Sequence, residues 1–467
     1  MTAVSLGTIF NDRSAARTPL VLLKNLVLEK DETNLIDGKA WITRPGTVAA
    51  QDPGPDFRGV FQQDGLFNGD MLVAAGPALY RLTNGVYSVL CVLPGSDLVA
   101  FAASADSVMI CAGSSAYVYD GTTLLPVVMP SSEAIGWISY LAGYFLLGVE
   151  NSQKIFFLVD GASPPNPDAL DYFSSATQTG NVLRGMTLSD QLLLFGQNVV
   201  EFWQASGDAN LPYSRIVGMV YQKGIVSEFS ACSQDNSIFF IGNDLVVYRC
   251  ENVPVRVSIN SVEEKLRQNV SSPPVCWAFN MDGHSYVVIT ITGYGTLVYD
   301  ASTGAWLPWQ TGTSPLWTCQ YGIQLDAGTA IAGTPGAPGL YKISGAYTDD
   351  LGAPITREIM GGVPVLGPPQ RCDSFSLVVD AGGGTSLTDQ MEIDLCFSDD
   401  QGQSYSNWIP MVAGSNGQYS VQPVARMLGM MRYPMRVFHL RSSVMGPFRI
   451  SLARVNEYFA SPILGGQ

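Results

Sequence analysis

One short unit recurs seven times along this chain, and that recurrence limits the possible folds more than any other feature. Each unit has an apolar strand, a tight turn rich in Gly, Asn or Ser, and a second strand that carries a large aromatic residue. These aromatic residues follow one another at spacings of 39, 38, 45, 46, 51 and 42 residues and are Tyr80, Tyr119, Phe157, Phe202, Tyr248, Tyr299 and Tyr341. A repeat of about 40–50 residues that holds several short strands is typical of a β-propeller blade.

The order of strand, turn and strand is that of a β-hairpin whose turn needs positive φ. Seven unrelated hairpins in a sandwich or meander would be the alternative, but the near-constant spacing favours a repeat. We therefore predict an all-β chain in which a β-propeller of about seven blades is followed by an antiparallel β-sandwich.

Changes in composition suggest three parts. Residues 1–53 are expected to form an N-terminal arm with strands at 20–28 and 39–42, one of which closes the propeller ring. Residues 54–362 form the propeller domain. After a linker rich in Gly and Pro, residues 363–467 form the C-terminal sandwich domain, in which 391–395 alternate between apolar and acidic side chains.

A helix is expected at residues 261–268, inserted between the fifth and sixth blades, where the longest spacing falls. Ser261 followed by Glu264 has the pattern of a capping box. The apolar residues Val262 and Leu266 form a stripe too narrow for deep burial, so we expect an interaction element on the propeller rim.

Charge and motifs argue against several functional classes. The formal net charge is −15, which disfavours affinity for phosphate backbones. There is no apolar stretch long enough for a membrane span, and GxSxG, P-loop and HExxH motifs are absent. The two histidines, His284 and His439, are interpreted as structural. We therefore assign no catalytic, cofactor-binding or metal-binding residues, expect no cofactor, and predict that the protein is not an enzyme.

The weaker candidates for chemistry are interpreted as structural. Residues 398–408 approximate an Asp-box and are expected to form a hairpin turn, and the acidic pairs 349–350 and 399–400 lack the spacing of a calcium loop. Glycoside hydrolysis would need paired carboxylates, for which the only loop candidates are Asp160, Asp168, Asp171 and Glu201. The eight cysteines have no CxxC spacing and are expected to be free thiols buried in strands of a protein that folds in a reducing cytosol.

Charge is segregated within the C-terminal part. Residues 372–425 hold seven acids and no Lys or Arg, whereas 426–454 hold six arginines and no acid. Either the two segments pair across strands inside one sandwich, or the acidic half of one copy faces the basic half of the next.

Several segments resemble the tail nozzle or hub proteins of short-tailed bacteriophages, also called packaged-DNA stabilisation proteins. The similarity is carried by residues 180–207, 220–230, 259–268 and 297–312, by the RPGT turn at 44–47, and by 371–382 and 398–408 in the C-terminal part. Order and spacing match across nearly the whole chain.

The resemblance implies a structural virion protein of the phage tail, assembled in the host cytoplasm. It implies a hexameric ring below the portal and the head-to-tail adaptor, which continues the DNA channel, retains packaged DNA through a tail needle or plug, and docks tailspikes or fibres. An acidic channel would let genomic DNA pass during ejection without specific binding. A glycan-binding or glycan-hydrolysing propeller of a phage tail is the alternative, and a scaffold propeller with a peptide partner is a third possibility.

Overall fold

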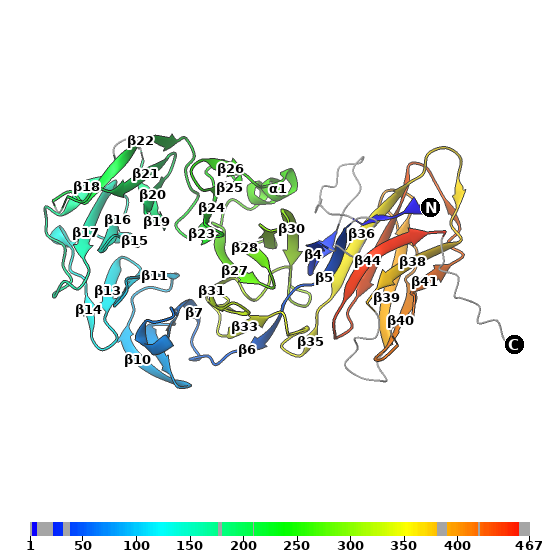
Figure 1. Ribbon diagram of the computed structural model, residues 1–467, viewed down its shortest axis with the longest axis horizontal. Coiled ribbons are helices and arrows are strands. Elements are labelled where there is room, and N and C mark those ends of the chain that lie inside the picture. Colours follow the sequence, from blue (N-terminus) through cyan, green and yellow to red (C-terminus); the bar gives the residue numbers. More distant parts are fainter. Residues whose placement is uncertain are drawn as a thin grey trace. The chain divides into compact units, whose positions relative to one another are not determined.

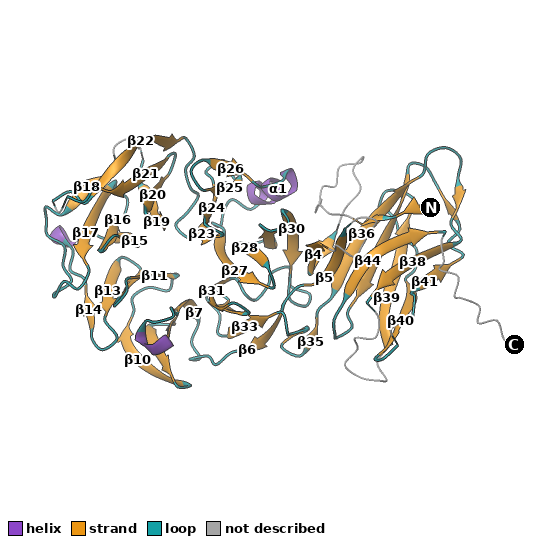
Figure 2. Cartoon of the chain, viewed as in Figure 1, coloured by secondary structure: helices purple, strands orange, loops and turns teal. Residues whose placement is uncertain are grey.

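The computed structural model describes residues 2–6, 22–30, 38–175, 180–208, 210–380, 390–418 and 421–456. Contacts divide the chain into two compact units. The sandwich unit consists of Met1–Val48, Leu297–Leu316 and Ser344–Gln467, and the propeller unit consists of Ala49–Thr296 and Trp317–Ile343. Strands dominate the secondary structure (Figure 2). We describe each unit by itself.

Four-stranded antiparallel sheets follow one another along the propeller unit, and the strands of each sheet pair in chain order (Figure 1). Blade 1 contains β7 (Phe57–Phe61), β8 (Met71–Ala75), β9 (Ala78–Thr83) and β10 (Val86–Val92). Blade 2 contains β11 (Val99–Ala103), β12 (Val108–Ala112), β13 (Ser115–Tyr119) and β14 (Leu124–Pro126). Blade 3 contains β15 (Ile135–Leu141), β16 (Tyr144–Val149), β17 (Lys154–Val159) and β18 (Tyr172–Ser174). Short 3-10 turns lie at η1 (Phe67–Gly69) and η2 (Pro130–Ser132).

The same pattern of strands continues in blades 4 to 7. Blade 4 contains β19 (Val182–Leu188), β20 (Gln191–Gly196), β21 (Val200–Ala205) and β22 (Tyr213–Tyr221). Blade 5 contains β23 (Ala231–Gln234), β24 (Ser237–Ile241), β25 (Val247–Cys250) and β26 (Pro254–Arg256). The sixth sheet has the order β27 (Val275–Met281), β28 (His284–Ile291), β29 (Gly295–Asp300) and β30 (Ala305–Trp309). The seventh has β31 (Tyr321–Asp326), β32 (Thr329–Gly333), β33 (Leu340–Ser344), β6 (Gly46–Ala49), β34 (Asp349–Asp350) and β35 (Ala353–Pro354).

The aromatic residue of each sequence repeat lies in the third strand of a blade. Among the described residues there are seven such sheets, and each contributes one of the seven aromatic residues from its third strand: β9, β13, β17, β21, β25, β29 and β33. The apolar strand before each aromatic is the second strand, which is wholly buried in β12 and β24. The prediction of a propeller of about seven blades is therefore confirmed.

Apolar clusters between neighbouring blades hold the propeller unit together. Blades 2 and 3 share Met109, Phe145 and Phe156 in one such cluster. Blades 7 and 1 share Ile331 and Phe57 in another, so the last blade packs on the first. Burial of side chains of this size contributes about 1.5–3 kcal/mol each.

The sandwich unit contains two six-stranded sheets. The first has the order β4 (Leu26–Lys30), β5 (Lys39–Thr43), β44 (Arg449–Val455), β38 (Ser374–Val379) and β41 (Val424–Arg426), with β1 (Thr2–Ala3) paired to β44. The second has the order β2 (Ser5–Leu6), β36 (Arg357–Pro364), β43 (Met435–Ser442), β39 (Gln390–Ser398) and β40 (Ile409–Ser415), with β3 (Leu23–Lys24) paired to β36. A small ribbon joins β37 (Gln370–Arg371) to β42 (Met430–Met431). The rings of Phe375 and Phe438, one from each sheet, lie 4.6 Å apart.

The sandwich uses both ends of the chain, which the sequence analysis did not foresee. Strands expected in an N-terminal arm pair inside this unit, where Ile42 of β5 faces Arg449 of β44. The expected linker begins inside strand β36, which ends at Pro364 and pairs with β43 over its whole length. The first two residues of the predicted strand at 20–28 lie outside the described residues. The domain boundaries 1–53, 54–362 and 363–467 stay a prediction.

The single α-helix of the described residues, α1 (Asn260–Gln268), lies between β26 and β27 as expected, but its cap and its burial differ from the prediction. Its N-cap is Ile259, with no side-chain cap, and Ser261 lies inside the first turn. Val262, Glu263 and Leu266 are buried. The expectation of shallow burial was wrong because the narrow apolar stripe is completed by Glu263, whose carboxylate is bound by polar neighbours. That the helix is an interaction element on the propeller rim stays a prediction.

Candidate functional surfaces

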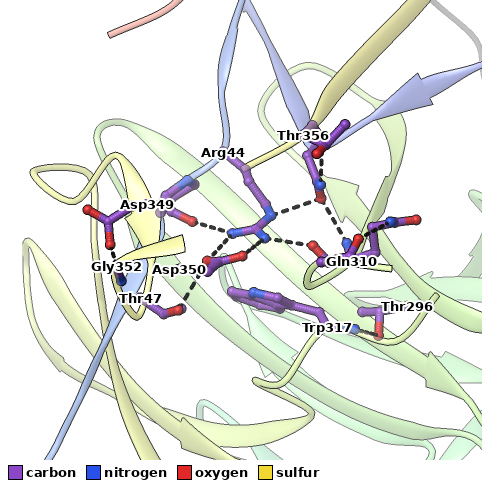
Figure 3. A network of polar contacts seen from close by, with 12 residues as sticks. Arg44, Thr47, Thr296, Gln310, Trp317, Asp349, Asp350, Gly352 and Thr356 are labelled. Atoms are coloured by element: carbon purple, nitrogen blue, oxygen red, sulfur yellow. Dashed lines mark hydrogen bonds and ion pairs between the residues drawn. The ribbon is translucent and has the colours of Figure 1, made fainter. Parts of the chain in front are cut away.

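Arg44, in the RPGT turn, is the centre of a buried polar network in the sandwich unit (Figure 3). Its guanidinium makes a bidentate pair with Asp350, with Nη1 to Oδ1 at 3.0 Å and Nη2 to Oδ2 at 2.5 Å. Nε donates to Asn25 Oδ1, and Nη2 also donates to the carbonyl oxygen of Gln310. Thr47 Oγ1 donates to Asp350 at 3.1 Å. Because every charged atom has a partner, the desolvation cost of the pair is offset.

The two acidic pairs weighed as calcium loops are each bound by an arginine. Asp350 pairs with Arg44, and Asp399 pairs with Arg436, whose side chain is 1% exposed. Arg436 also donates to two backbone carbonyls and lies over the ring of Phe397. Among the described residues no group of three or more His, Cys, Asp or Glu side chains is placed to hold a metal ion.

Acidic residues of the sandwich unit pair with Arg436, Arg441 and Arg449 of the 426–454 segment. Arg441 donates to Asp394 at 3.0 Å across neighbouring strands, and Arg449 pairs with Glu29 and Asp380. With the pair of Arg436 and Asp399, these contacts favour cross-strand pairing over the subunit-interface interpretation. Asp389, one of the seven acids, lies outside the described residues.

The segment 398–408 forms the turn of the hairpin between β39 and β40, as expected. Asp400 accepts hydrogen bonds from the backbone and side chain of Ser404, which lower the pKa of the Asp400 carboxyl to about 2. Trp408 packs edge-on against His439 at 5.0 Å. His439 Nε2 lies 3.0 Å from Glu358, so this histidine is part of the strand packing.

Three of the four candidate carboxylates for glycoside hydrolysis accept hydrogen bonds from neighbouring groups. Glu201, expected in a loop, lies in β21, is fully buried and accepts a hydrogen bond from Trp203 Nε1. Asp160 accepts from Ser107, and Asp168 caps a local turn through the backbone N–H of Leu170. Each of these carboxylates thus has a structural contact.

Seven of the eight cysteines are buried, Cys91 is partly buried, and all are free.

The innermost strands of the propeller unit are the first strands of the blades. β7 contacts β11 and β31, β11 contacts β15, β15 contacts β19, and β27 contacts β23 and β31. These strands therefore surround the propeller axis. Side chains that point inward from them determine whether the axis is open.

Side chains from several blades meet at this axis. Arg184 of β19 pairs with Glu228, which precedes β23, at 3.0 Å. The Arg184 guanidinium lies 5.7 Å from the ring of Phe229, and that ring lies 5.8 Å from the ring of Tyr321 in β31. This chain of contacts links blade 4 to blade 7 across the axis. The major groove of B-form DNA alone is about 12 Å wide, so the whole duplex is wider than that. A duplex therefore cannot pass between these side chains.

Burial changes the acidity of the groups at the axis. It raises the pKa of the Glu228 carboxyl to about 7, although neighbouring Arg184 acts in the opposite direction. It also raises the pKa of the Cys111 thiol to about 12. Glu228 therefore titrates near neutral pH in the folded protein.

A cavity of about 380 Å³ lies beside this cluster. Its wall comes from the starts of β15 and β19, from the turns after β12 and β16, and from the segments that precede β11 and β23. The sequence gives no signal for this cavity because its lining residues come from blades 2 to 5 and share no local motif. None of the described helices is long and apolar enough to cross a membrane.

The repeated four-stranded sheets define the class of the chain as a β-propeller protein. The sequence model of the family described as Bacteriophage P22 Gp10, beta-propeller, matches residues 21–328. The chain belongs to this phage family, and it is a structural component of the virion tail. The resemblance stated from the sequence motifs is thereby confirmed.

The solved structures to which the chain is similar are distant in sequence. The complex of BBS1N with ARL6DN has a TM-score of 0.43 and 12% identity over 65% of this chain and 98% of that chain. The Dos1 propeller has a TM-score of 0.41 and 9% identity over 73% and 95% of the two chains. YCF48 from Cyanidioschyzon merolae has a TM-score of 0.41 and 9% identity over 65% and 99%. No curated protein matches the chain.

Proposed function

We propose that this protein forms a hexameric tail-nozzle ring below the portal and the head-to-tail adaptor. The ring continues the DNA channel, retains packaged DNA with a needle or plug, and docks tailspikes or fibres. The observation that carries this proposal is the family match over residues 21–328. The protein has no catalytic role in this proposal, and no residue is assigned to a cofactor or a metal.

Two physical properties support a channel that lies between copies. The axis of the propeller unit is filled by Arg184, Phe229 and Tyr321, so the duplex needs another path. The net charge of −15 per chain gives a six-membered ring a strongly negative field, which disfavours adsorption of phosphates to its wall. DNA then passes through the ring without specific binding.

Mass photometry of the purified full chain, alone and with its adaptor, tests the ring. We expect a species of six copies in at least one of these samples. A gel-shift titration with linear duplex at about 0.15 M salt tests the channel wall, and we expect no binding in the micromolar range. A chain that stays monomeric in both samples and cleaves or binds a polysaccharide would support the glycan-active alternative instead.

A further inference from the structure

Four large apolar side chains are exposed on two neighbouring segments of the sandwich unit, 364–371 and 426–433. Leu366, Met427 and Tyr433 are 78%, 87% and 73% exposed, and Met430 is 47% exposed. A group of apolar side chains left in contact with water on one part of a surface is typical of a site that binds another protein.

The backbone brings these side chains together. Arg371 of β37 lies directly opposite Met430 of β42, so the two side chains share one face of the ribbon. The residue before Leu366 donates through its N–H to the carbonyl oxygen of the residue after Tyr433, which places Leu366 beside Tyr433. The exposed side chains thus belong to one continuous surface.

A buried arginine fixes this ribbon. Arg436 donates to the carbonyl oxygens of Leu428 and Met430 and forms an ion pair with Asp399. The exposed side chains therefore extend from a backbone that is already ordered, which lowers the entropic cost of binding a partner.

The charge of this surface is positive. The two segments hold Arg371, Arg426 and Arg432, all exposed, and no acid, although the adjacent Asp373 pairs with Arg371. Methionine, tyrosine and arginine are the residue types that are enriched at protein interfaces. We call this set the ribbon surface, which consists of Leu366, Arg371, Met427, Met430, Arg432 and Tyr433. It suits a partner that is apolar and acidic.

The propeller unit of the same chain has such a surface at the outer edge of blade 3. The segment 159–172 joins β17 to β18 and exposes Val159, Leu170 and Tyr172. It also holds three acids and no Lys or Arg. We call this set the edge surface, which consists of Val159, Asp160, Asp168, Leu170, Asp171 and Tyr172.

The surroundings of the edge surface are acidic as well. Lys154, which lies over the ring of Tyr172, is paired with Glu133. The propeller unit as a whole contains 23 Asp and Glu against 11 Lys and Arg, a net charge of −12. The ribbon surface is thus complementary in charge to the propeller of another copy.

We propose that the ribbon surface of one copy binds the edge surface of the next copy in the ring. A closed ring of identical chains needs two different and complementary surfaces on each chain, and these two match in apolar character and in charge. Leu170 packs against Met430 and Tyr433, and the arginines face the aspartates. The inference rests on the proposed ring and adds the contact between its neighbouring copies.

Sedimentation velocity of the full chain tests the contact with one variant of each surface. Tyr433→Asp disrupts the ribbon surface and Leu170→Arg disrupts the edge surface, and each should weaken self-association about tenfold or more. An equimolar mixture of the two variants should form a dimer and nothing larger. The intact ribbon surface of the Leu170→Arg chain can bind the intact edge surface of the Tyr433→Asp chain, but no further pair of intact surfaces remains.

Val255→Arg, at an exposed position of β26 in blade 5, is the matched control for Leu170→Arg. It should associate as the unaltered protein does. If circular dichroism shows that a first variant is unfolded, Met430→Asp or Val159→Arg takes its place.

Unchanged association of a folded variant of either surface, or a mixture that stays monomeric, would overturn the proposal. An unaltered chain that stays monomeric up to about 100 µM would overturn it too, and a ring that then forms on the adaptor would leave the nozzle function standing. A dimer in the mixture without a six-membered ring in any sample would support the contact and contradict the hexameric nozzle.

Discussion

Arg44 and Asp350, 306 residues apart in the sequence, form a bidentate ion pair that is almost wholly shielded from solvent. The pair joins the RPGT turn to the two-residue strand β34, and Asn25 and Gln310 complete the hydrogen bonding of the guanidinium (Figure 3). An arginine suits this position because its planar fork matches a carboxylate and leaves further donors for carbonyl oxygens. The turn by which the family resemblance begins is therefore a structural centre of the sandwich unit.

Asp350→Asn should lower the free energy of unfolding by about 3–5 kcal/mol, because the Arg44 charge stays buried without its counterion. Urea unfolding followed by near-UV circular dichroism measures this loss. The neighbouring Asp349→Asn is the control, since the Asp349 carboxylate accepts from an exposed turn N–H, that of Gly352. A loss of similar size in both variants would show that the turn, and not the ion pair, determines the stability.

Glu263→Gln should lower the free energy of unfolding by about 1–3 kcal/mol. The adjacent Glu264 lies in the same short helix and offers a comparison. The Glu263 carboxylate accepts from Ser258 Oγ at 2.8 Å and pairs with Arg256 and Arg267. Differential scanning calorimetry should detect a lower melting temperature. Glu264→Gln serves as the control and should change it little, and equal melting temperatures for both variants would restore the expectation of shallow burial.

Gly185→Ala should be strongly destabilising, by about 3 kcal/mol or more, because the added methyl group would overlap the indole of Trp137. The same reasoning applies to Gly148→Ala in the neighbouring strand. Gly328→Ala tests the general effect of the substitution, since its Cβ would meet no atom closer than 3.8 Å. Denaturant midpoints that match for Gly185→Ala and Gly328→Ala would contradict the packing described for Trp137.

Stability should fall between about pH 4.5 and pH 7 because of Glu228. Its pKa is raised to about 7 in the folded protein, so the unfolded chain loses this proton more readily than the folded chain does. The contribution is fully present below the unfolded pKa and is lost as the pH rises through 7, by about 2–3 kcal/mol in total. Urea unfolding at intervals from pH 5 to pH 8 measures it.

Glu228→Gln should remove this fall, whereas Glu150→Gln, at an exposed position of the same cavity, should keep it. If Glu228→Gln and the unaltered protein lose stability equally over this range, another group causes the dependence.

The parts of the fold that depend on local sequence patterns could be predicted. Tyr80 and Tyr341 each follow a buried strand and a tight turn, so the hairpins and their period stand out along the chain. Only the C-terminal strands of the sandwich could be predicted. Strand β5 pairs with β44, about 400 residues away, and nothing near Ile42 encodes that register.

The contacts at the propeller axis could not be predicted from local patterns either. Arg184 and Glu228 both lie in segments that carry the family resemblance, but their contact depends on how the neighbouring blades 4 and 5 pack, which no local motif encodes. The burial of Glu263 was missed for a related reason: hydrophobic periodicity detects apolar faces and gives no weight to a carboxylate that finds partners in a neighbouring loop.

Cryo-electron microscopy of the intact virion tail tests the central claim most directly. The account predicts six copies of this chain around one axis below the adaptor, with the DNA density on the ring axis and side-chain density filling the centre of each propeller. A tail in which this chain is absent, or in which the duplex runs through the centre of a single propeller past Phe229, would contradict it.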